Sequence, residues 1–320
     1  MIDLWELQNN QVVKLNLKTS SWKSSKHINW IDCFNPTKEE LSLLAKEFGL
    51  LVADLQKSIH PRQRSYLIFK NNHYLITFRG TYSDVKIKTA PIGIFVFKNK
   101  IITIHNKPLN GFNQLRELPK EEFLHLFKKD FSYFLFKLIN FIQEDFFVLM
   151  EKIGEDIEKI EEDVLNVKKA TEINIFSQKH NLINLQKSLL ANRAAISSLE
   201  KEYLRNYSKE EHNWFMELYN DANQLVDVSA TYHEMLTNAL DVYLSSVNTN
   251  INRTMKTLTA LSAFVLVPTL ISSIYGMNFQ KVSPWNMPEL YWNYGYFFAL
   301  GMILISIILV YIFFKKKKLL

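Results

Sequence analysis

The chain has 320 residues, of which 48% are hydrophobic and 13% aromatic, and its formal net charge is +6. Its eight glycines are too dispersed to form a dinucleotide fingerprint or a Walker-type phosphate loop, which excludes nucleotide-driven chemistry of the common kinds. The single cysteine, Cys33, excludes a disulfide framework and a cysteine-based zinc knuckle. Setting aside four lysines near the C-terminus leaves 34 basic against 32 acidic residues, so no nucleic-acid partner is expected.

Residues 1–118 are predicted to form an α+β domain. Runs rich in β-branched and aromatic residues, separated by turn residues, predict strands, and 65–70 with 73–80 and 92–98 with 101–106 are expected to form hairpins. A helix is expected over 37–48, with Asn35 as its cap and Pro36 in its first turn, and a shorter helix over 51–58. The six predicted strands cover 12–17, 28–34, 65–70, 73–80, 92–98 and 101–106.

Residues 119–257 are predicted to form long helices, because apolar residues recur at helical spacing with almost no glycine or proline. The expected helices cover 120–166, 171–204 and 209–275. The third continues into the first uncharged run of the chain, and at 1.5 Å per residue it would be about 100 Å long. A helix of this length cannot bury itself within one small chain, so oligomerisation around it is expected.

Two uncharged runs near the C-terminus, 258–275 and 291–314, are long enough to cross a hydrocarbon core of about 30 Å. A loop over 276–290 joins them, and a basic tail, 315–320, follows the second. Because flanks rich in lysine stay on the cytoplasmic side, Lys315, Lys316, Lys317 and Lys318 place the C-terminus in the cytoplasm. No signal peptide is recognised in MIDLWELQNN. We therefore expect a multi-pass protein of the inner or plasma membrane with both termini cytoplasmic. The alternative is a soluble protein in which both runs are buried core helices.

A mostly polar stripe with coiled-coil spacing runs along the third helix. Its members are separated alternately by four and three residues: Asn248, Asn252, Met255, Thr259, Ser262, Leu266, Thr269 and Ser273. Hydroxyl and amide groups facing lipid cost free energy, so the stripe should face another helix or water. The stripe alone supports both interpretations equally. The two asparagines below the membrane favour a pore, in which Met255 and Leu266 would form apolar rings that gate by dewetting.

The two runs contain no Asp or Glu, which argues against a proton-coupled pump and against a carboxylate site that strips a cation of its water. A neutral path suits a cation that keeps its hydration shell. Mg²⁺ is the natural candidate, since it dehydrates reluctantly.

The first run ends in Tyr275-Gly276-Met277-Asn278, and Met287-Pro288-Glu289-Leu290 follows before the second run. In this position the sequence resembles the CorA-type magnesium transporter family, whose signature is Gly-Met-Asn at the end of the first of two spans. The resemblance extends back through 241–264 and, more loosely, over the whole chain. An Asn278 amide oxygen can accept hydrogen bonds from the waters around a cation. The other interpretation of Asn278 is a helix cap. Gly276 is expected to turn the chain at φ values closed to other residues.

The resemblance implies a funnel-shaped homopentamer that passes Mg²⁺, with Co²⁺ or Ni²⁺ as further cargo, and that is not an enzyme. Gly276, Met277 and Asn278 would form the selectivity filter, and Leu258 joins the stripe as a pore-lining residue. Mg²⁺ is implied as both transported and regulatory ion, with no organic cofactor. Regulatory Mg²⁺ is expected between protomers at Glu217 and Asp221 with a neighbour's Asp84, and Asp241, also on or near the stalk, is a further candidate ligand. The alternatives are a zinc transporter of the same superfamily and a non-conducting, membrane-anchored coiled-coil scaffold.

Overall fold

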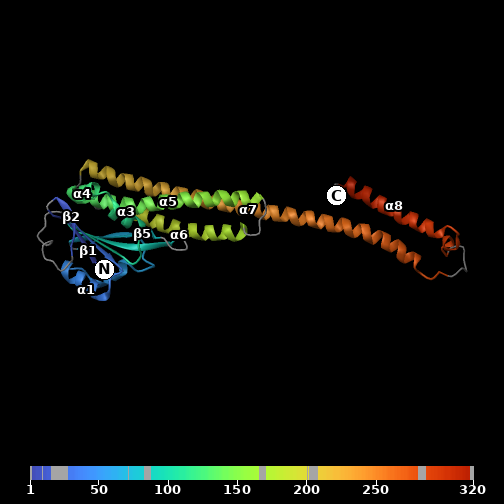
Figure 1. The fold of residues 1–320 in the computed structure, drawn as a ribbon, viewed down its shortest axis with the longest axis horizontal. Helices are drawn as coiled ribbons and strands as arrows, with labels where there is room; N and C mark the ends of the chain where they lie inside the picture. The colour runs from blue at the N-terminus through green and yellow to red at the C-terminus, as the bar shows by residue number, and fades with distance from the viewer. Residues whose placement is uncertain are drawn as a thin grey trace. The chain divides into compact units, whose positions relative to one another are not determined.

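The computed structural model describes residues 2–8, 10–15, 28–70, 72–82, 88–165, 171–199, 201, 208–279 and 286–317. The chain divides into two compact units, Met1–Leu240 and Asp241–Leu320. Helix α7 (Lys209–Tyr275) begins in the first unit and ends in the second. An α+β domain is thus followed by long helices and two apolar C-terminal helices, as the sequence predicts (Figure 1).

A seven-stranded mixed sheet forms the centre of the first unit. Its strand order is β2-β1-β3-β7-β6-β5-β4, and β3 pairs with β7 in parallel while every other neighbouring pair is antiparallel. Both predicted hairpins are confirmed, since β4 pairs with β5 and β6 with β7. The central strands are buried on both faces, which explains their near-continuous apolar sequence. The strands are β1 (Ile2–Gln8), β2 (Gln11–Leu15), β3 (Asn29–Phe34), β4 (Tyr66–Lys70), β5 (His73–Tyr82), β6 (Lys88–Val96) and β7 (Lys100–His105).

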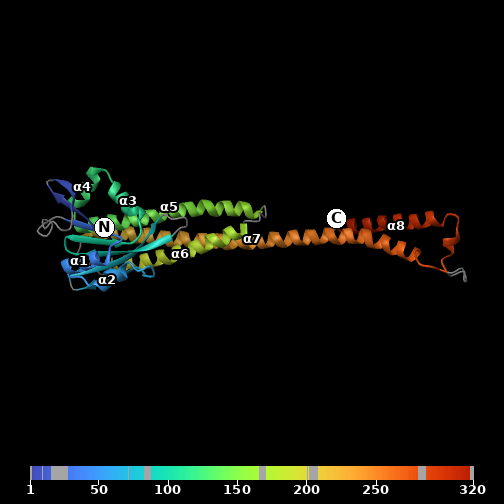
Figure 2. The same cartoon turned by 60° about the horizontal axis from the view of Figure 1, so that its bottom comes forward.

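Helices α1 (Lys38–Phe48) and α2 (Val52–Ser58) cover one face of the sheet (Figure 2). Leu44 and Leu55 belong to a buried apolar cluster that includes Ile102 of β7. The predicted cap of α1 was wrong, because Thr37 and not Asn35 occupies that position. The Thr37 hydroxyl accepts a hydrogen bond from the Glu40 amide, and the Glu40 carboxylate accepts one from the Thr37 amide. Such reciprocal capping satisfies two helix donors.

The other face of the sheet is covered by α3 (Asn110–Glu117) and α5 (Phe131–Leu165), with α6 (Thr171–Ser198) over β4, β5 and β6 (Figure 2). Trp30 of β3 contacts Phe112 and Phe134 through its ring and donates its indole N–H to Thr103. A Cβ atom at Gly111 would lie 2.6 Å from the carbonyl oxygen of Phe141, so only glycine lets α3 approach α5 this closely.

Three elements differ from the prediction. β1 and α3 were not expected, and the single helix expected over 120–166 is two helices, α4 (Lys120–Lys128) and α5. Lys129 has an extended backbone, and the Asp130 carbonyl accepts the amides of Tyr133 and Phe134 at the start of α5. The helix expected over 171–204 is observed as far as Ser198, and residues 200 and 202–207 lie outside the described residues. Residues 16 and 17, the end of the strand expected over 12–17, also lie outside them.

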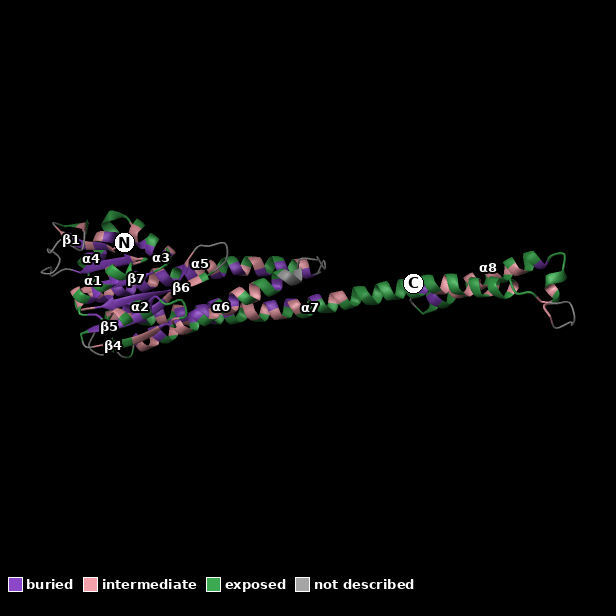
Figure 3. Ribbon diagram, turned by 90° about the horizontal axis from the view of Figure 1, so that it is seen from below, coloured by how far each residue is buried: buried purple, intermediate pink, exposed green. Residues whose placement is uncertain are grey.

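The second unit contains the end of α7 and helix α8 (Gly295–Lys316), joined by a loop with a short 3₁₀ helix, η4 (Pro288–Tyr291). Among the described residues, α7 and α8 are the two helices long and apolar enough to cross a membrane. α7 ends at Tyr275, the predicted position, whereas α8 starts four residues after residue 291. Most side chains of these segments are exposed in the single chain (Figure 3).

Candidate functional site

Helix α8 covers one face of α7 within the second unit. Ala260 on this face is only 3% exposed. The ring of Phe264 stacks on that of Phe314 near the end of α8, with 6.4 Å between ring centroids. Ala260 and Phe264 are four residues apart and therefore lie on the same side of α7.

The predicted stripe lies on the opposite side of α7. Ser262 and Leu266 each follow Ala260 and Phe264 by two residues, which corresponds to about 200° around a helix. All eight stripe residues are exposed, including Met255 at 56% and Leu266 at 69%. Leu258, also exposed, precedes Thr259 by one residue and lies at the edge of the stripe. The eight are Asn248, Asn252, Met255, Thr259, Ser262, Leu266, Thr269 and Ser273. The single chain thus leaves the hydroxyl and amide groups of the stripe uncovered.

One hydroxyl of the stripe is oriented by the helix itself. The Thr269 hydroxyl donates its hydrogen to the Val265 carbonyl, with 2.6 Å between the oxygens. With its hydrogen used in this way, the oxygen can act toward other partners only as an acceptor, through its two lone pairs. Pro268, immediately before it, has no N–H, so the Phe264 carbonyl, on the α8 side of the helix, lacks its helical donor. On the stripe side, the acceptor oxygen of Thr269 is suited to a cation and to the waters around it.

The Gly-Met-Asn sequence follows the last turn of α7. The amide of Gly276 donates to the Ser272 carbonyl at 3.0 Å, and the amide of Met277 donates to the Ile274 carbonyl at 3.2 Å. The helix end is therefore closed by backbone amides, and the side chain of Asn278 is exposed beyond it. Exposure leaves the Asn278 amide accessible to a partner outside the single chain.

The expected conformation of Gly276 was wrong. Among the described glycines only Gly49 has a positive φ, so Gly276 does not make a turn closed to other residues. A Cβ atom at Gly276 would lie 3.4 Å from the carbonyl oxygens of Ser272 and Ser273, which is an ordinary contact. Within one chain, neither backbone conformation nor space requires glycine at this position.

A hydrogen bond links the end of α7 to the loop before α8. The Tyr275 hydroxyl donates to a carboxylate oxygen of Glu289 at 3.3 Å, and the Tyr291 hydroxyl donates to the Phe279 carbonyl at 3.2 Å. Glu289 was not among the predicted site residues, although the Met-Pro-Glu-Leu motif contains it. These two bonds hold the residues on both sides of Asn278 against η4.

The comparisons with known proteins agree with this geometry. The family described as CorA-like Mg²⁺ transporter protein matches residues 25–316, which is most of the chain. The chain belongs to this family.

Two CorA proteins illustrate the likeness. The chain is 32% identical over 286 residues to the cobalt/magnesium transport protein CorA of Methanocaldococcus jannaschii, covering 89% of both chains. It is 31% identical over 275 residues to the protein of the same name from Thermotoga maritima, covering 85% of this chain and 77% of the other. The complete structure of the CorA magnesium transporter from Methanocaldococcus jannaschii superimposes with a TM-score of 0.86 at 26% identity, covering 98% of this chain and 97% of that one.

The acidic residues predicted for regulation in this CorA-family chain lie in different places. Glu217 is exposed on α7, and Asp221 follows it by one turn. Burial raises the pKa of Asp221, and the negative charges of Glu217 and of Glu144 on α5 raise it further. Glu144 was not predicted, because it comes from a different helix and no sequence spacing connects the two.

The remaining predicted acids do not join this group. Asp241 is exposed in the second unit, and Asp84 lies outside the described residues. In the described part of the chain, no group of three or more His, Cys, Asp or Glu side chains could hold a metal ion.

The basic end of α8 completes the second unit. Lys315 and Lys316 form the last turn of the helix, and Lys317 follows it, while Lys318 lies outside the described residues. The ammonium of Lys315 lies 5.7 Å from the centre of the Tyr311 ring. Aromatic and basic side chains at the end of an apolar helix are typical of the membrane interface.

Proposed function

We propose that this protein is a channel for divalent cations, in which the stripe of α7 lines the path and Mg²⁺ passes with most of its hydration shell. The observation that carries the proposal is the uncharged, exposed stripe opposite α8, which leads to an exposed Asn278. The CorA relatives, named for transport of magnesium and cobalt, support Mg²⁺ as the main cargo and Co²⁺ as further cargo, and we propose Ni²⁺ as a third ion.

Several copies of α7 are needed to enclose a path. Val265 precedes Leu266 by one residue and Leu270 follows Thr269 by one, so exposed apolar side chains lie about 100° to either side of the stripe. Apolar flanks on both sides of a polar face suit a ring in which each α7 contacts a neighbour on each side. The family resemblance gives the number of copies as five, with α8 outside and the cytoplasmic unit forming a funnel.

The Gly276-Met277-Asn278 segment would form the selectivity filter at the outer end of the path. Five Asn278 amides can accept hydrogen bonds from the first-shell waters of Mg²⁺ without replacing them. Mg²⁺ holds its waters tightly, so recognition through them spares the cost of dehydration. Neutral oxygens also hold the ion weakly enough for it to leave.

The membrane potential would drive inward movement. Moving two charges across 100 mV is worth about 4.6 kcal/mol, so nucleotide hydrolysis is unnecessary. We place both termini in the cytoplasm of a cell whose inner or plasma membrane contains α7 and α8, so that Asn278 lies at the outer entrance. The lysines at the end of α8 support that orientation.

Closure would involve the apolar side chains of the stripe and regulatory Mg²⁺. Met255 and Leu266 from each copy can form rings narrow enough to expel water. Cytosolic Mg²⁺ bound by Glu217 and Asp221, with Asp84 of a neighbour, would neutralise carboxylates that otherwise repel one another, and Asp241, about 30 Å further along α7, would belong to a separate site. If so, replacing Asp84, Glu217 and Asp221 by Ala weakens the protection that Mg²⁺ gives the cytoplasmic unit against protease. Unchanged protection would refute these ligands.

The deciding experiment measures ion flux. Purified protein in liposomes, with an inside-negative potential, should take up Mg²⁺ in preference to Zn²⁺, and reversing the potential should stop uptake. Preferential uptake of Zn²⁺ would instead indicate a zinc transporter. Absence of flux for Mg²⁺, Co²⁺ and Zn²⁺ would indicate a scaffold without a pore.

A further inference from the structure

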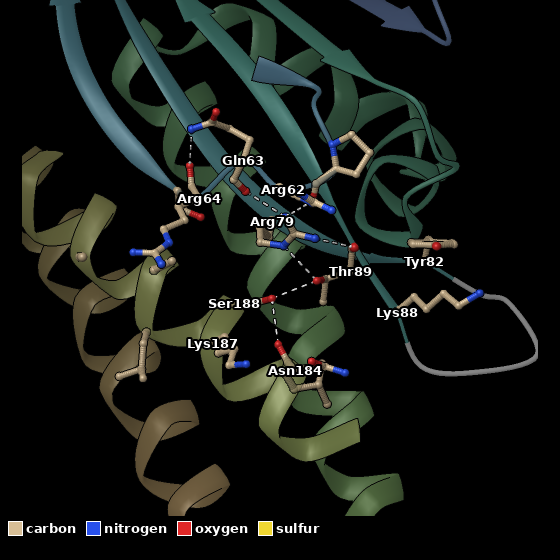
Figure 4. A pocket seen from close by; sticks show the side chains of 16 residues that line it. Arg62, Gln63, Arg64, Arg79, Tyr82, Lys88, Thr89, Asn184, Lys187 and Ser188 are labelled. Carbon is tan, nitrogen blue, oxygen red and sulfur yellow. Dashed lines mark hydrogen bonds between the residues drawn. The ribbon is translucent and has the colours of Figure 1, made fainter. Parts of the chain in front are cut away.

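A cavity of about 920 Å³ opens in the first unit, far along the chain from the stripe. Its walls are the segment 61–65, the ends of β5 and β6, and one face of α6 (Figure 4). This volume is at the upper end of the range typical for small-molecule sites. None of its lining residues belongs to the proposed ion path.

The cavity is lined by basic side chains. Five of its lining residues carry positive charge, and none of its described lining residues is acidic: the five are Arg62, Arg64, Arg79, Lys88 and Lys187. Of these, Arg62, Arg64 and Lys187 are exposed and form no ion pair within the described residues. A cavity with this balance concentrates anions.

Arg79 occupies the centre of the lining, between Gln63 and Thr89 (Figure 4). Its guanidinium donates to the carbonyls of Pro61, Gln63 and Thr89 at 2.8–3.1 Å, and to the Thr89 hydroxyl at 3.0 Å. Burial lowers the pKa of Arg79, but an arginine side chain stays protonated. The acceptors of these hydrogen bonds are uncharged oxygens, which do not neutralise the positive charge of Arg79. That charge can therefore attract an anion in the cavity.

Hydrogen bonds hold the walls in place before any ligand arrives. The Asn192 side chain of α6 accepts from the Ser65 hydroxyl and the Arg79 amide, and donates to the Arg79 carbonyl, at 2.6–2.9 Å. The hydroxyls of Thr89 and Ser188 lie 2.9 Å apart, and Ser188 donates to the Asn184 carbonyl (Figure 4). A preformed site avoids the entropic cost of ordering its walls on binding.

We propose that this cavity binds a soluble organic anion with two or more phosphate groups, of the size and class of a nucleoside diphosphate. Arg64 and Lys187 would contact the phosphates, since both are exposed cations of the lining and guanidinium and ammonium groups are the usual phosphate donors. Tyr82 and Leu190 supply apolar surface for the organic part. Such a site uses side chains and needs no glycine-rich loop, so it agrees with the composition of the chain. The proposal does not depend on ion conduction.

The test is isothermal titration of the full-length protein in detergent with ADP, pyrophosphate and inorganic phosphate, in EDTA so that Mg²⁺ does not compete. The test variant is Arg64→Gln with Lys187→Gln. The control variant, Lys46→Gln with Lys152→Gln, removes the same charge at exposed positions that do not line the cavity. Thermal unfolding of both variants checks that the fold is intact, which we expect because all four side chains are exposed.

We expect saturable binding of ADP to the unmodified protein, weakened at least about tenfold in the test variant and unchanged in the control. Binding should also weaken as salt is raised. Equally tight binding of pyrophosphate would support the proposal and assign the affinity to the phosphates. Absence of saturable binding of both ADP and pyrophosphate at about 1 mM, which corresponds to about 4.1 kcal/mol, would overturn it. Equal weakening in the control variant would overturn it as well.

Discussion

The direction in which the stripe faces can be tested with cysteine substitutions, because the one native cysteine is buried and should not react with added reagents. This cysteine, Cys33, is 0% exposed, and burial raises the pKa of its thiol. Two pairs of positions are matched in depth: Ser262 with Ala260, and Thr269 with Val267. Within each pair the residues differ by about 3 Å along the helix axis and by about 200° in direction. All four substitutions by cysteine change the side-chain volume little.

A thiol in contact with water has a pKa of about 8.5, so about 3% is thiolate at pH 7, and burial against α8 or lipid lowers this fraction. We therefore expect Ser262→Cys and Thr269→Cys to react with a water-soluble methanethiosulfonate at least about tenfold faster than Ala260→Cys and Val267→Cys, in protein reconstituted into liposomes. Added Mg²⁺ should slow the two fast positions. Equal rates within the pairs, or faster labelling of the α8-facing positions, would refute the assignment of this face to water.

Three further outcomes follow from single contacts. Asn192→Ala removes three hydrogen bonds and leaves backbone groups of β5 unpaired, so it should cost about 2–4 kcal/mol and lower Tm by about 5–15 °C, whereas exposed Asn184→Ala should change Tm little. Burial raises the pKa of Asp145 to about 6 from 3.8. The protonated Asp145 therefore contributes stability that is fully present below pH 3.8 and is lost as the pH rises through 6. Asp145→Asn should flatten this part of the Tm-against-pH curve, and an unchanged curve would contradict the raised pKa. Gly295→Ala places a methyl group on a carbonyl of the preceding loop and should reduce Mg²⁺ flux, whereas Gly301→Ala, which meets nothing within 4 Å, should not.

Long helices with a clear period were predictable from the sequence. The segment 209–275 is one helix, α7, as expected, because apolar spacing continues through it without a break. Its start is fixed by Ser208, whose hydroxyl accepts from the Glu211 amide while the Glu211 carboxylate accepts from the Ser208 amide. Local signals of this kind need only a few neighbouring residues.

Elements fixed by distant contacts were missed. β1 contains Asp3, a residue type usually found at the surface. Here it is buried, and its carboxylate oxygen lies 2.7 Å from the ammonium nitrogen of Lys14 in β2. α3 contains Gly111, which reads as a helix breaker but allows contact with α5. The break between α4 and α5 was also missed. Asp130, at the start of α5, is a residue type typical of helix starts, but the apolar periodicity on both sides of it suggested one continuous helix.

The candidate site was predictable as a pattern and not as an arrangement. The spacing of the stripe identified one face of α7, but which face α8 covers depends on Ala260 and on the stacking of Phe264 with Phe314, 50 residues apart. The bond from Tyr275 to Glu289 joins two motifs whose proximity the sequence does not specify. Charge repulsion between acids of α5 and α7 likewise depends on helix packing.

The most direct test of a path through Asn278 is Mg²⁺ flux through the Asn278→Ala variant. Protein and variant would be reconstituted at equal density in liposomes that contain a Mg²⁺-sensitive dye, with an inside-negative potential. If Asn278 amides bind the waters of the passing ion, the variant should lose at least about tenfold in Mg²⁺ flux, about 1.4 kcal/mol, or lose its preference for Mg²⁺ over Zn²⁺. Flux and preference equal to those of the unmodified protein would contradict the proposed channel.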